Sequence, residues 1–319
     1  MNQDQLFSLT TRPNPDLFFR SKDPNDYRLG AVAEHKIESY QKSRFVIVSC
    51  SQDEGINRNS GRIGAAKGPA AIRQAFYKLA APEKMETGDL FDLGDTAFDD
   101  SLEKIHQRHY QIVESLLRDG KKIIVLGGGN DLSYPDCKAH QQVFPKTAAV
   151  NIDAHLDIRK NLLANSGTPY RQLIDENIIE PHRFYEIGIQ KHANSKVYLN
   201  HAHRIGINII TLDDIQQAFI NNDIDTRLNQ LRSESLFIGL DMDSIRASDA
   251  PGVSAPSPIG LSGEQAVFLL RYLIGKNRVN LLEITEMNPI YDLDSRTAKL
   301  AAILALTYLD NSVSEIICP

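Results

Sequence analysis

The chain has 319 residues, of which 42% are hydrophobic and 24% are charged, and its formal net charge is -6. This composition is typical of a globular protein and excludes a disordered chain or a disulfide scaffold. The mild acidity gives no general attraction to nucleic acid or anionic lipid, and no segment approaches the roughly 18 apolar residues that span a bilayer.

The first 43 residues are polar and rich in turn residues, so we expect an extension with one or two short helices, packed on the outside of a domain. From Arg44 onward, apolar runs typical of buried parallel strands recur at residues 44–49, 122–126, 148–152, 184–189, 207–210, 235–240 and 279–284. Helical patterns lie between them at residues 69–80, 102–117, 264–274 and 297–309. This alternation predicts one α/β domain over residues 1–319, with a doubly wound, mostly parallel sheet.

The cellular setting follows from the cysteines and the N-terminus. Cys50, Cys137 and Cys318 are odd in number and widely spaced, which favours a reduced, cytoplasmic location. The N-terminal residues are polar and show no apolar run of the kind found in signal peptides. We therefore expect a cytoplasmic protein.

Polar side chains follow several of the predicted strands, where ligands bind in parallel α/β folds. The run at 148–152 is followed by Asp153, His155 and Asp157, whose spacing of two places them on one face of an extended chain. The run at 235–240 is followed by Asp241 and Asp243. A single Asp-x-Asp motif often belongs to a turn or a helix cap. The two motifs together, however, predict a site for a divalent cation such as Mn²⁺.

The chain resembles the ureohydrolase superfamily, to which arginase, agmatinase and formimidoylglutamase belong. The matching segments lie at residues 61–73, 126–131, 151–157, 166–172, 239–244, 250–256 and 286–289. SGTP, APGVSAP and DLDSRTAKLAA are most similar to the formimidoylglutamase branch. That resemblance implies a three-layer α/β/α sandwich of the arginase type, and hydrolysis of N-formimidoyl-L-glutamate to L-glutamate and formamide in histidine degradation.

The resemblance also implies a centre of two manganese ions. Asp153 and Asp241 would bridge the ions, Asp157 would complete one site, and His155 with Asp243 would complete the other. Glu286 would hold the amidine nitrogens of the substrate, with a structural ion pair as the alternative. Asp157 would also carry protons during catalysis.

The glycine-rich motif departs from the family pattern, because Asn130 stands where the family has a histidine ligand. A neutral amide oxygen is a poorer ligand for Mn²⁺ than an imidazole nitrogen, so we expect the ion shared with Asp157 to bind weakly or not at all. Asp131 could replace Asn130 if the loop shifted by one residue. The change is compatible with an active variant, with a one-metal enzyme or with an inactive one.

Substrate contacts are expected from Arg159, Tyr170, Arg171 and Glu286. Tyr170 stands where arginase has a histidine that handles protons, which argues against arginase itself. A substrate with two carboxylates requires cations, and a guanidinium holds a carboxylate in two places. Both arginines could instead pair with surface acids.

Three functions therefore remain open: a formimidoylglutamase, a hydrolase of a guanidino compound that releases urea, and a metal-poor relative with a binding or structural role. The expected partner is a small amidine or guanidino compound, without nucleic acid or membrane. The family also implies a homo-oligomer.

Overall fold

A computed structural model describes residues 1–23 and 25–315 of the chain. Within them the strands form one sheet in the order β1-β3-β2-β4-β9-β8-β5-β6-β7. Their bounds are β1 (Thr10–Thr11), β2 (Phe45–Cys50), β3 (Leu90–Thr96), β4 (Lys122–Gly127), β5 (Ala148–Ile152), β6 (Phe184–Ile189), β7 (Asn208–Thr211), β8 (Leu236–Asp241) and β9 (Val279–Thr285). Every pairing is parallel except that of β1 with β3.

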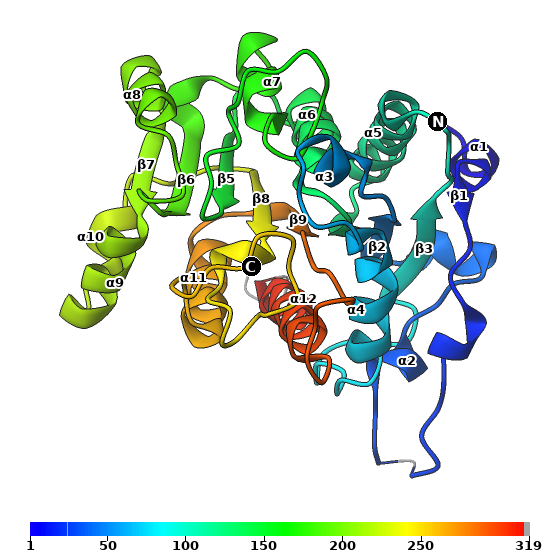
Figure 1. Ribbon diagram of the computed structural model, residues 1–319. Coiled ribbons are helices and arrows are strands. Elements are labelled where there is room, and N and C mark those ends of the chain that lie inside the picture. The colour runs from blue at the N-terminus through cyan, green and yellow to red at the C-terminus, as the bar shows by residue number, and fades with distance from the viewer. Residues whose placement is uncertain (24, 316–319) are drawn as a thin grey trace.

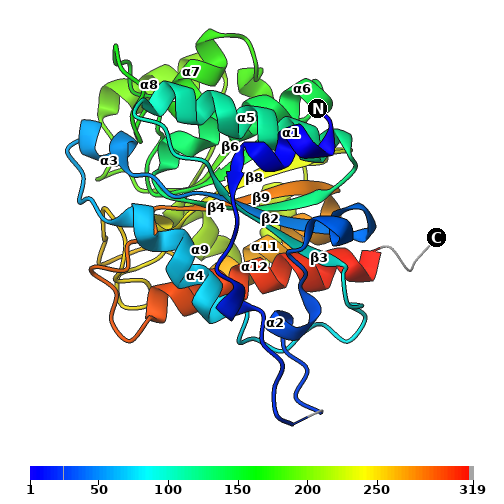
Figure 2. The same cartoon turned by 90° about the vertical axis from the view of Figure 1, so that its right-hand side faces the viewer.

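Helices cover both faces of the sheet, as Figure 2 shows with the strands edge-on. One face carries α1 (Gln3–Ser8), α5 (Leu102–Arg118), α6 (Ser133–Val143), α7 (Pro169–Asp175) and α8 (Lys196–Ile205). The opposite face carries α4 (Gly68–Phe76), α9 (Leu212–Asn221), α11 (Gly263–Lys276) and α12 (Arg296–Glu315). The remaining short helices are α2 (Leu29–Val32), α3 (Glu54–Arg58) and α10 (Ile224–Leu228). The predicted α/β/α sandwich with a mostly parallel sheet is confirmed.

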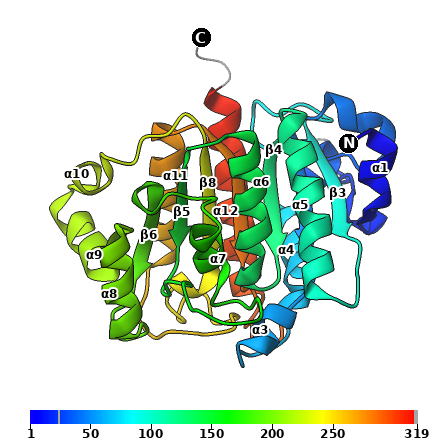
Figure 3. The same cartoon turned by 90° about the horizontal axis from the view of Figure 1, so that it is seen from above.

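Successive side chains of each strand point to opposite faces of the sheet, so a separate apolar core forms on each face. In β4, Ile124 and Leu126 point into the core beneath α4, α11 and α12, whereas Ile123 and Val125 point into the core beneath α5 and α6. Figure 3 shows α5 and α6 on this second face, running roughly along the direction of the strands beneath them. Because both faces are buried, the strand sequences are almost continuously apolar, which is why their positions could be predicted.

Two strands of the sheet, β1 and β3, were not expected from the sequence. In β3 the apolar pattern is interrupted by Asp92, Gly94 and Asp95. Asp92 is nevertheless fully buried, because Arg73 of α4 donates to both of its carboxylate oxygens over 2.8 and 3.0 Å. A long-range ion pair, rather than a local pattern, therefore allows this segment to lie inside the sheet.

The N-terminal residues reach the edge of the sheet. β1 pairs with β3, and the guanidinium of Arg12 then donates to the carbonyl oxygens of Leu93 and Asp92 over 2.6 and 3.1 Å. Figure 1 shows this segment, in blue, along the margin opposite β7. Two short helices, α1 and α2, lie in this region. That residues 1–43 extend a single domain stays a prediction.

Two further observations concern the expected location of the protein in the cell. Among the described residues, no helix combines the length and the apolar content that crossing a membrane would require. Cys50 and Cys137 are buried free thiols, and Cys318 lies outside the described residues. The cytoplasmic location stays a prediction.

Candidate metal centre

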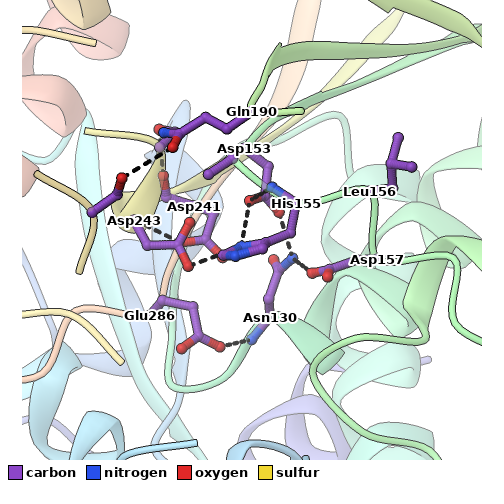
Figure 4. Close-up of polar contacts among 12 residues, drawn as sticks. Asn130, Asp153, His155, Leu156, Asp157, Gln190, Asp241, Asp243 and Glu286 are labelled. Carbon is purple, nitrogen blue, oxygen red and sulfur yellow. Dashed lines mark hydrogen bonds and ion pairs between the residues drawn. The ribbon is translucent and has the colours of Figure 1, made fainter. Parts of the chain in front are cut away.

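The order of the strands brings the predicted acidic residues together. β4, β9, β8 and β5 are consecutive neighbours in the sheet, and all four are parallel. Their carboxyl ends therefore meet at one rim, where each strand is followed by polar residues. These strand ends and the loops after them carry Asn130, Glu286, Asp241 with Asp243, and Asp153 to Asp157, in that order (Figure 4).

Two overlapping groups of potential ligands lie at this rim. One ligand atom from each of Asp153, His155 and Asp243 lies within 4.8 Å of the others, and Asp153, Asp157 and Asp241 form a second such group. Asp153 belongs to both groups. The prediction that these strand ends converge is therefore matched by the geometry.

Local hydrogen bonds fix the two aspartates that begin the motifs. Asp153 Oδ1 accepts from the backbone N–H of His155 over 2.7 Å, and Asp241 Oδ1 accepts from that of Asp243 over 2.7 Å. In each motif the first carboxylate thus caps the turn that follows its strand. This shared turn presents the residue two positions later, His155 or Asp243, towards the same point.

The backbone at two of the predicted catalytic residues is left-handed. Asp157 has φ 46° and Glu286 has φ 65°, a region that is unfavourable for residues with a side chain. The Glu286 conformation is held by its N–H, which donates to the carbonyl of Gly128 over 2.8 Å. Such strain at non-glycine residues is common where a side chain must be aimed at a functional site.

The site concentrates negative charge in a buried place. Burial and the charge of Asp243 raise the pKa of Asp153 to about 6, and burial raises the pKa of Asp157, Asp241 and Glu286 well above its usual range. The charge of Asp243 also raises the pKa of His155 to about 12. Carboxylates packed in this way repel one another, and a divalent cation would relieve that repulsion.

The donor set fits manganese. Its atoms are carboxylate oxygens and one imidazole nitrogen, the mixed hard and borderline ligands that suit Mn²⁺. His155 Nδ1 lies 3.2 Å from Asp243 Oδ2 and 3.4 Å from Asp153 Oδ1. The three residues thus offer ligand atoms close enough together to face one ion.

Asn130 lies at the centre but presents its nitrogen to it. Nδ2 donates to Asp157 Oδ2 over 2.6 Å and to Asp153 Oδ2 over 3.3 Å, while the backbone N–H donates to Glu286 Oε1 over 2.7 Å. Its role as a weak ligand stays a prediction. Asp131 is turned away from the rim, since Oδ2 accepts from Gln52 and lies 2.7 Å from His106 Nε2, so it cannot replace Asn130 without rearrangement.

The predicted substrate residues occupy different surroundings. Arg159 lines a cavity of about 310 Å³ together with residues of the centre and of α8; the lining includes His155, Asp157, Asn194, Ser195 and Tyr198. Its guanidinium donates to Asn59 Oδ1 over 3.3 Å and packs against Gly167, where a Cβ would come within 3.0 Å of Arg159 Cδ. Arg159 is thus an exposed residue that lines the same cavity as His155 and Asp157.

The structure does not bring Tyr170 or Arg171 to this cavity. Tyr170 is fully buried, and its ring stacks on that of Phe184 at 4.5 Å, so its contact with substrate stays a prediction. Arg171 lies on α7 and donates to Asp175 over 2.7 Å, the surface pairing that the sequence left open. The proline of the SGTP motif begins α7, which directs Tyr170 into the core.

The sequence analysis missed two polar residues near the centre, Gln190 and Asn194. Gln190, directly after β6, donates to the carbonyl of Ile259 over 3.0 Å and accepts from Ser257 Oγ over 3.0 Å. Asn194 accepts from the N–H of Leu156 and donates to the carbonyl of Ala154. Gln190 could have been found by extending the strand-end argument to β6, whereas Asn194 carries no local signal.

Comparison with known proteins agrees with the fold and this centre. A family model described as the arginase family matches residues 43–309, and the chain belongs to that family. Formimidoylglutamase of Staphylococcus carnosus is 30% identical over 314 residues, covering 93% of this chain and 98% of the relative. Formimidoylglutamase of Paraburkholderia xenovorans is 35% identical over 287 residues, covering 83% and 87%.

Solved structures extend the comparison. An asparagine-to-histidine variant of Trypanosoma cruzi formiminoglutamase with Mn2+2 superimposes with a TM-score of 0.83 at 28% identity, covering 91% of this chain and 99% of that one. Formimidoylglutamase of Bacillus subtilis gives a TM-score of 0.82 at 28% identity, covering 92% and 94%. The chain is thus similar over nearly its whole length to proteins of one enzyme type.

Proposed function

We propose that the chain hydrolyses N-formimidoyl-L-glutamate to L-glutamate and formamide at a manganese centre on the rim of the sheet. The observation that carries this proposal is the pair of overlapping ligand groups that share Asp153, with Arg159 across an adjoining cavity. The formimidoylglutamases to which the chain is similar support the choice of substrate.

We propose two manganese ions per chain. Asp153 and Asp241 would hold both, Asp157 would complete one site, and His155 with Asp243 would complete the other. The site beside Asn130 would be the weaker, because that residue offers the centre an amide N–H. Bound manganese supplies Lewis acidity and activates water for attack on the amidine carbon.

The chain's own residues bind and orient the substrate. Arg159 holds a carboxylate of the glutamate part by charge-assisted hydrogen bonds, which aligns the amidine with the acidic centre. Glu286 accepts hydrogen bonds from the amidine nitrogens. Asp157 then carries a proton towards the departing amine, so that water is added, the C–N bond breaks, and glutamate and formamide leave.

The test is a product assay on the manganese-loaded chain. Incubation with N-formimidoyl-L-glutamate should release formamide, whereas arginine and agmatine should release little urea. Urea as the main product would replace this proposal with a guanidino hydrolase. Full activity in Asp153→Asn or Asp241→Asn would refute the manganese centre.

An impaired relative is distinguished by the same assay. A silent native chain that gains activity in Asn130→His would show that Asn130 has disabled it. The homo-oligomer and the cytoplasmic location suggested by the family stay predictions.

A further inference from the structure

Ser254 carries a buried hydroxyl group that the fold leaves unpaired. The residue is 7% exposed, and its Oγ makes no hydrogen bond of normal geometry with another of the described residues. Most buried hydroxyl groups in proteins are paired, because taking one out of water without a partner costs free energy. The unpaired hydroxyl of Ser254 therefore calls for a partner that the chain itself does not supply, such as a bound ligand.

A short backbone pairing places Ser254 at the metal centre. Val253 forms an antiparallel bridge with Met287, so that the next residue along each segment, Ser254 and Glu286, also lie opposite each other. Burial raises the pKa of Glu286 well above its usual range, and the Ser254 hydroxyl acts on that pKa in the opposite direction. The unpaired hydroxyl thus lies beside the carboxyl group that is expected to hold the amidine of the substrate.

The backbone at Ser254 is fixed by Arg62, which comes from a distant part of the chain. The Arg62 guanidinium donates to the carbonyl oxygens of Val253 and Ser254 over 2.5 and 3.2 Å, and it lies 4.0 Å from the centre of the Tyr291 ring. A hydroxyl group presented from such a fixed backbone can meet a ligand without first being ordered. The site beside Glu286 is therefore preorganised.

We propose that Ser254 binds the terminal nitrogen of the substrate's amidine group, accepting a hydrogen bond from its N–H while donating the hydroxyl proton to the carboxylate of Glu286. This inference rests on the proposed function, in which Glu286 holds the amidine nitrogens. Glu286 Oε1 already accepts from the backbone N–H of Asn130 over 2.7 Å, which leaves Oε2 for Ser254 and the substrate.

The direction of both hydrogen bonds follows from the chemistry of the two partners. The nitrogens of a protonated amidine are donors only, and the oxygens of a carboxylate are acceptors only. A freely rotating hydroxyl group between them is fully paired in one way, by accepting from the nitrogen and donating to the oxygen. Substrate binding then removes the cost of the unpaired hydroxyl in the free chain.

The experiment uses two inhibitors that represent opposite ends of the substrate. Formamidinium contains the amidine group alone, and its inhibition of the manganese-loaded chain is followed by glutamate release. L-Glutamate contains the dicarboxylate part alone, and its inhibition is followed by formamide release. In Ser254→Ala we expect kcat/KM for N-formimidoyl-L-glutamate to fall about 10- to 100-fold, as for a lost hydrogen bond to a charged group. Inhibition by formamidinium should weaken by a similar factor, whereas inhibition by L-glutamate should not change.

Thermal unfolding gives a second readout. Because the hydroxyl of Ser254 is unpaired in the free chain, Ser254→Ala should not lower the melting temperature, whereas loss of a hydroxyl that stabilised the fold would lower it. The matched control is Ser248→Ala in the same loop. Ser248 is exposed, and its hydroxyl donates to Asp249 over 2.9 Å, so its removal should leave the kinetic constants unchanged.

The alternatives give different results. If the native chain released no formamide, the proposed function itself would be refuted, and the inference with it. An active native chain whose kcat/KM was unchanged in Ser254→Ala would refute only the role of Ser254. Equal weakening of inhibition by formamidinium and by L-glutamate, or a lower melting temperature of Ser254→Ala, would show that the hydroxyl supports the fold and would also overturn the inference.

Discussion

His155 Nδ1 lies 3.2 Å from Asp243 Oδ2, although the two residues follow different strands and are separated by a long stretch of chain. The contact arises because β5 and β8 are parallel neighbours, so the turns after them project to the same point. It joins the only imidazole predicted at the centre to a carboxylate of the second acidic motif.

Changing Asp243 should therefore remove one ion. We expect Asp243→Asn to reduce bound manganese from two ions to one per chain, because a charged ligand opposite His155 is lost. Metal analysis after equilibrium dialysis measures this. Asp213→Asn, an exposed residue at the start of α9, removes the same charge away from the rim and should leave the metal content unchanged.

Arg159 should control the affinity for a dicarboxylate substrate. We expect Arg159→Leu to raise KM for N-formimidoyl-L-glutamate by about 10- to 100-fold, as for a lost charge-assisted hydrogen bond, with a smaller change in kcat. Steady-state kinetics measures both constants. The matched control is Arg171→Leu, which removes an arginine whose side chain pairs with Asp175 instead. Equal effects of the two substitutions would contradict the role of Arg159.

The buried ion pair of Arg73 and Asp92 should be essential for stability. Arg73→Leu leaves the fully buried Asp92 without its bidentate partner, so we expect a loss of about 3–5 kcal/mol in the free energy of unfolding. Urea denaturation measures this loss. Arg118→Leu, which breaks a surface pair with Glu114 on α5, should change stability little.

A buried histidine should make the chain sensitive to acid. Burial lowers the pKa of His140 to about 3, so the folded chain keeps this ring neutral while the unfolded chain protonates it near pH 6.5. The associated stability is present above pH 6.5 and is lost as the pH falls towards 3.

The measurement compares unfolding at two pH values. The free energy of unfolding falls when the pH is lowered from 6.5 to 4.5. In His140→Gln this fall should be about 2 kcal/mol smaller than in the native chain. His203→Gln, at an exposed position of α8, serves as the control and should follow the native profile. A native-like profile for His140→Gln would show that His140 does not titrate as argued.

The ligand groups could be predicted because their signals are local. Asp153, His155, Asp241 and Asp243 follow buried apolar strands at a spacing of two, and parallel strands place such residues at one rim. By contrast, β3 was missed because Asp92 becomes compatible with a strand through Arg73 and Tyr77, which lie outside the strand. Periodicity within a short window contains no information about those partners.

Orientation is the second property that the sequence did not contain. The resemblance marked Asn130 as the unusual position, but the hydroxyls that face its oxygen include Thr285, 155 residues away. For Tyr170, too, the sequence did not show where the side chain points. Its motif suggested a substrate contact, whereas α7 places the ring in the core beside Phe184. Motif matching identifies which residues occur near a site, and the three-dimensional packing decides which atoms face it.

The contacts of Arg12 bear on how the molecule remains separate from its neighbours. An open sheet exposes unpaired amides and carbonyls at its outermost strand, which another chain can use to add a strand and begin aggregation. Here β1 pairs with the end of β3. The guanidinium of Arg12 donates to the next carbonyls, those of Leu93 and Asp92, in place of the backbone N–H groups of a longer edge strand. Glu34 completes the cover by bonding through its own backbone to Leu90 and Asp92. The short strand β1, the side chain of Arg12 and the backbone of Glu34 thus protect this margin from intermolecular pairing.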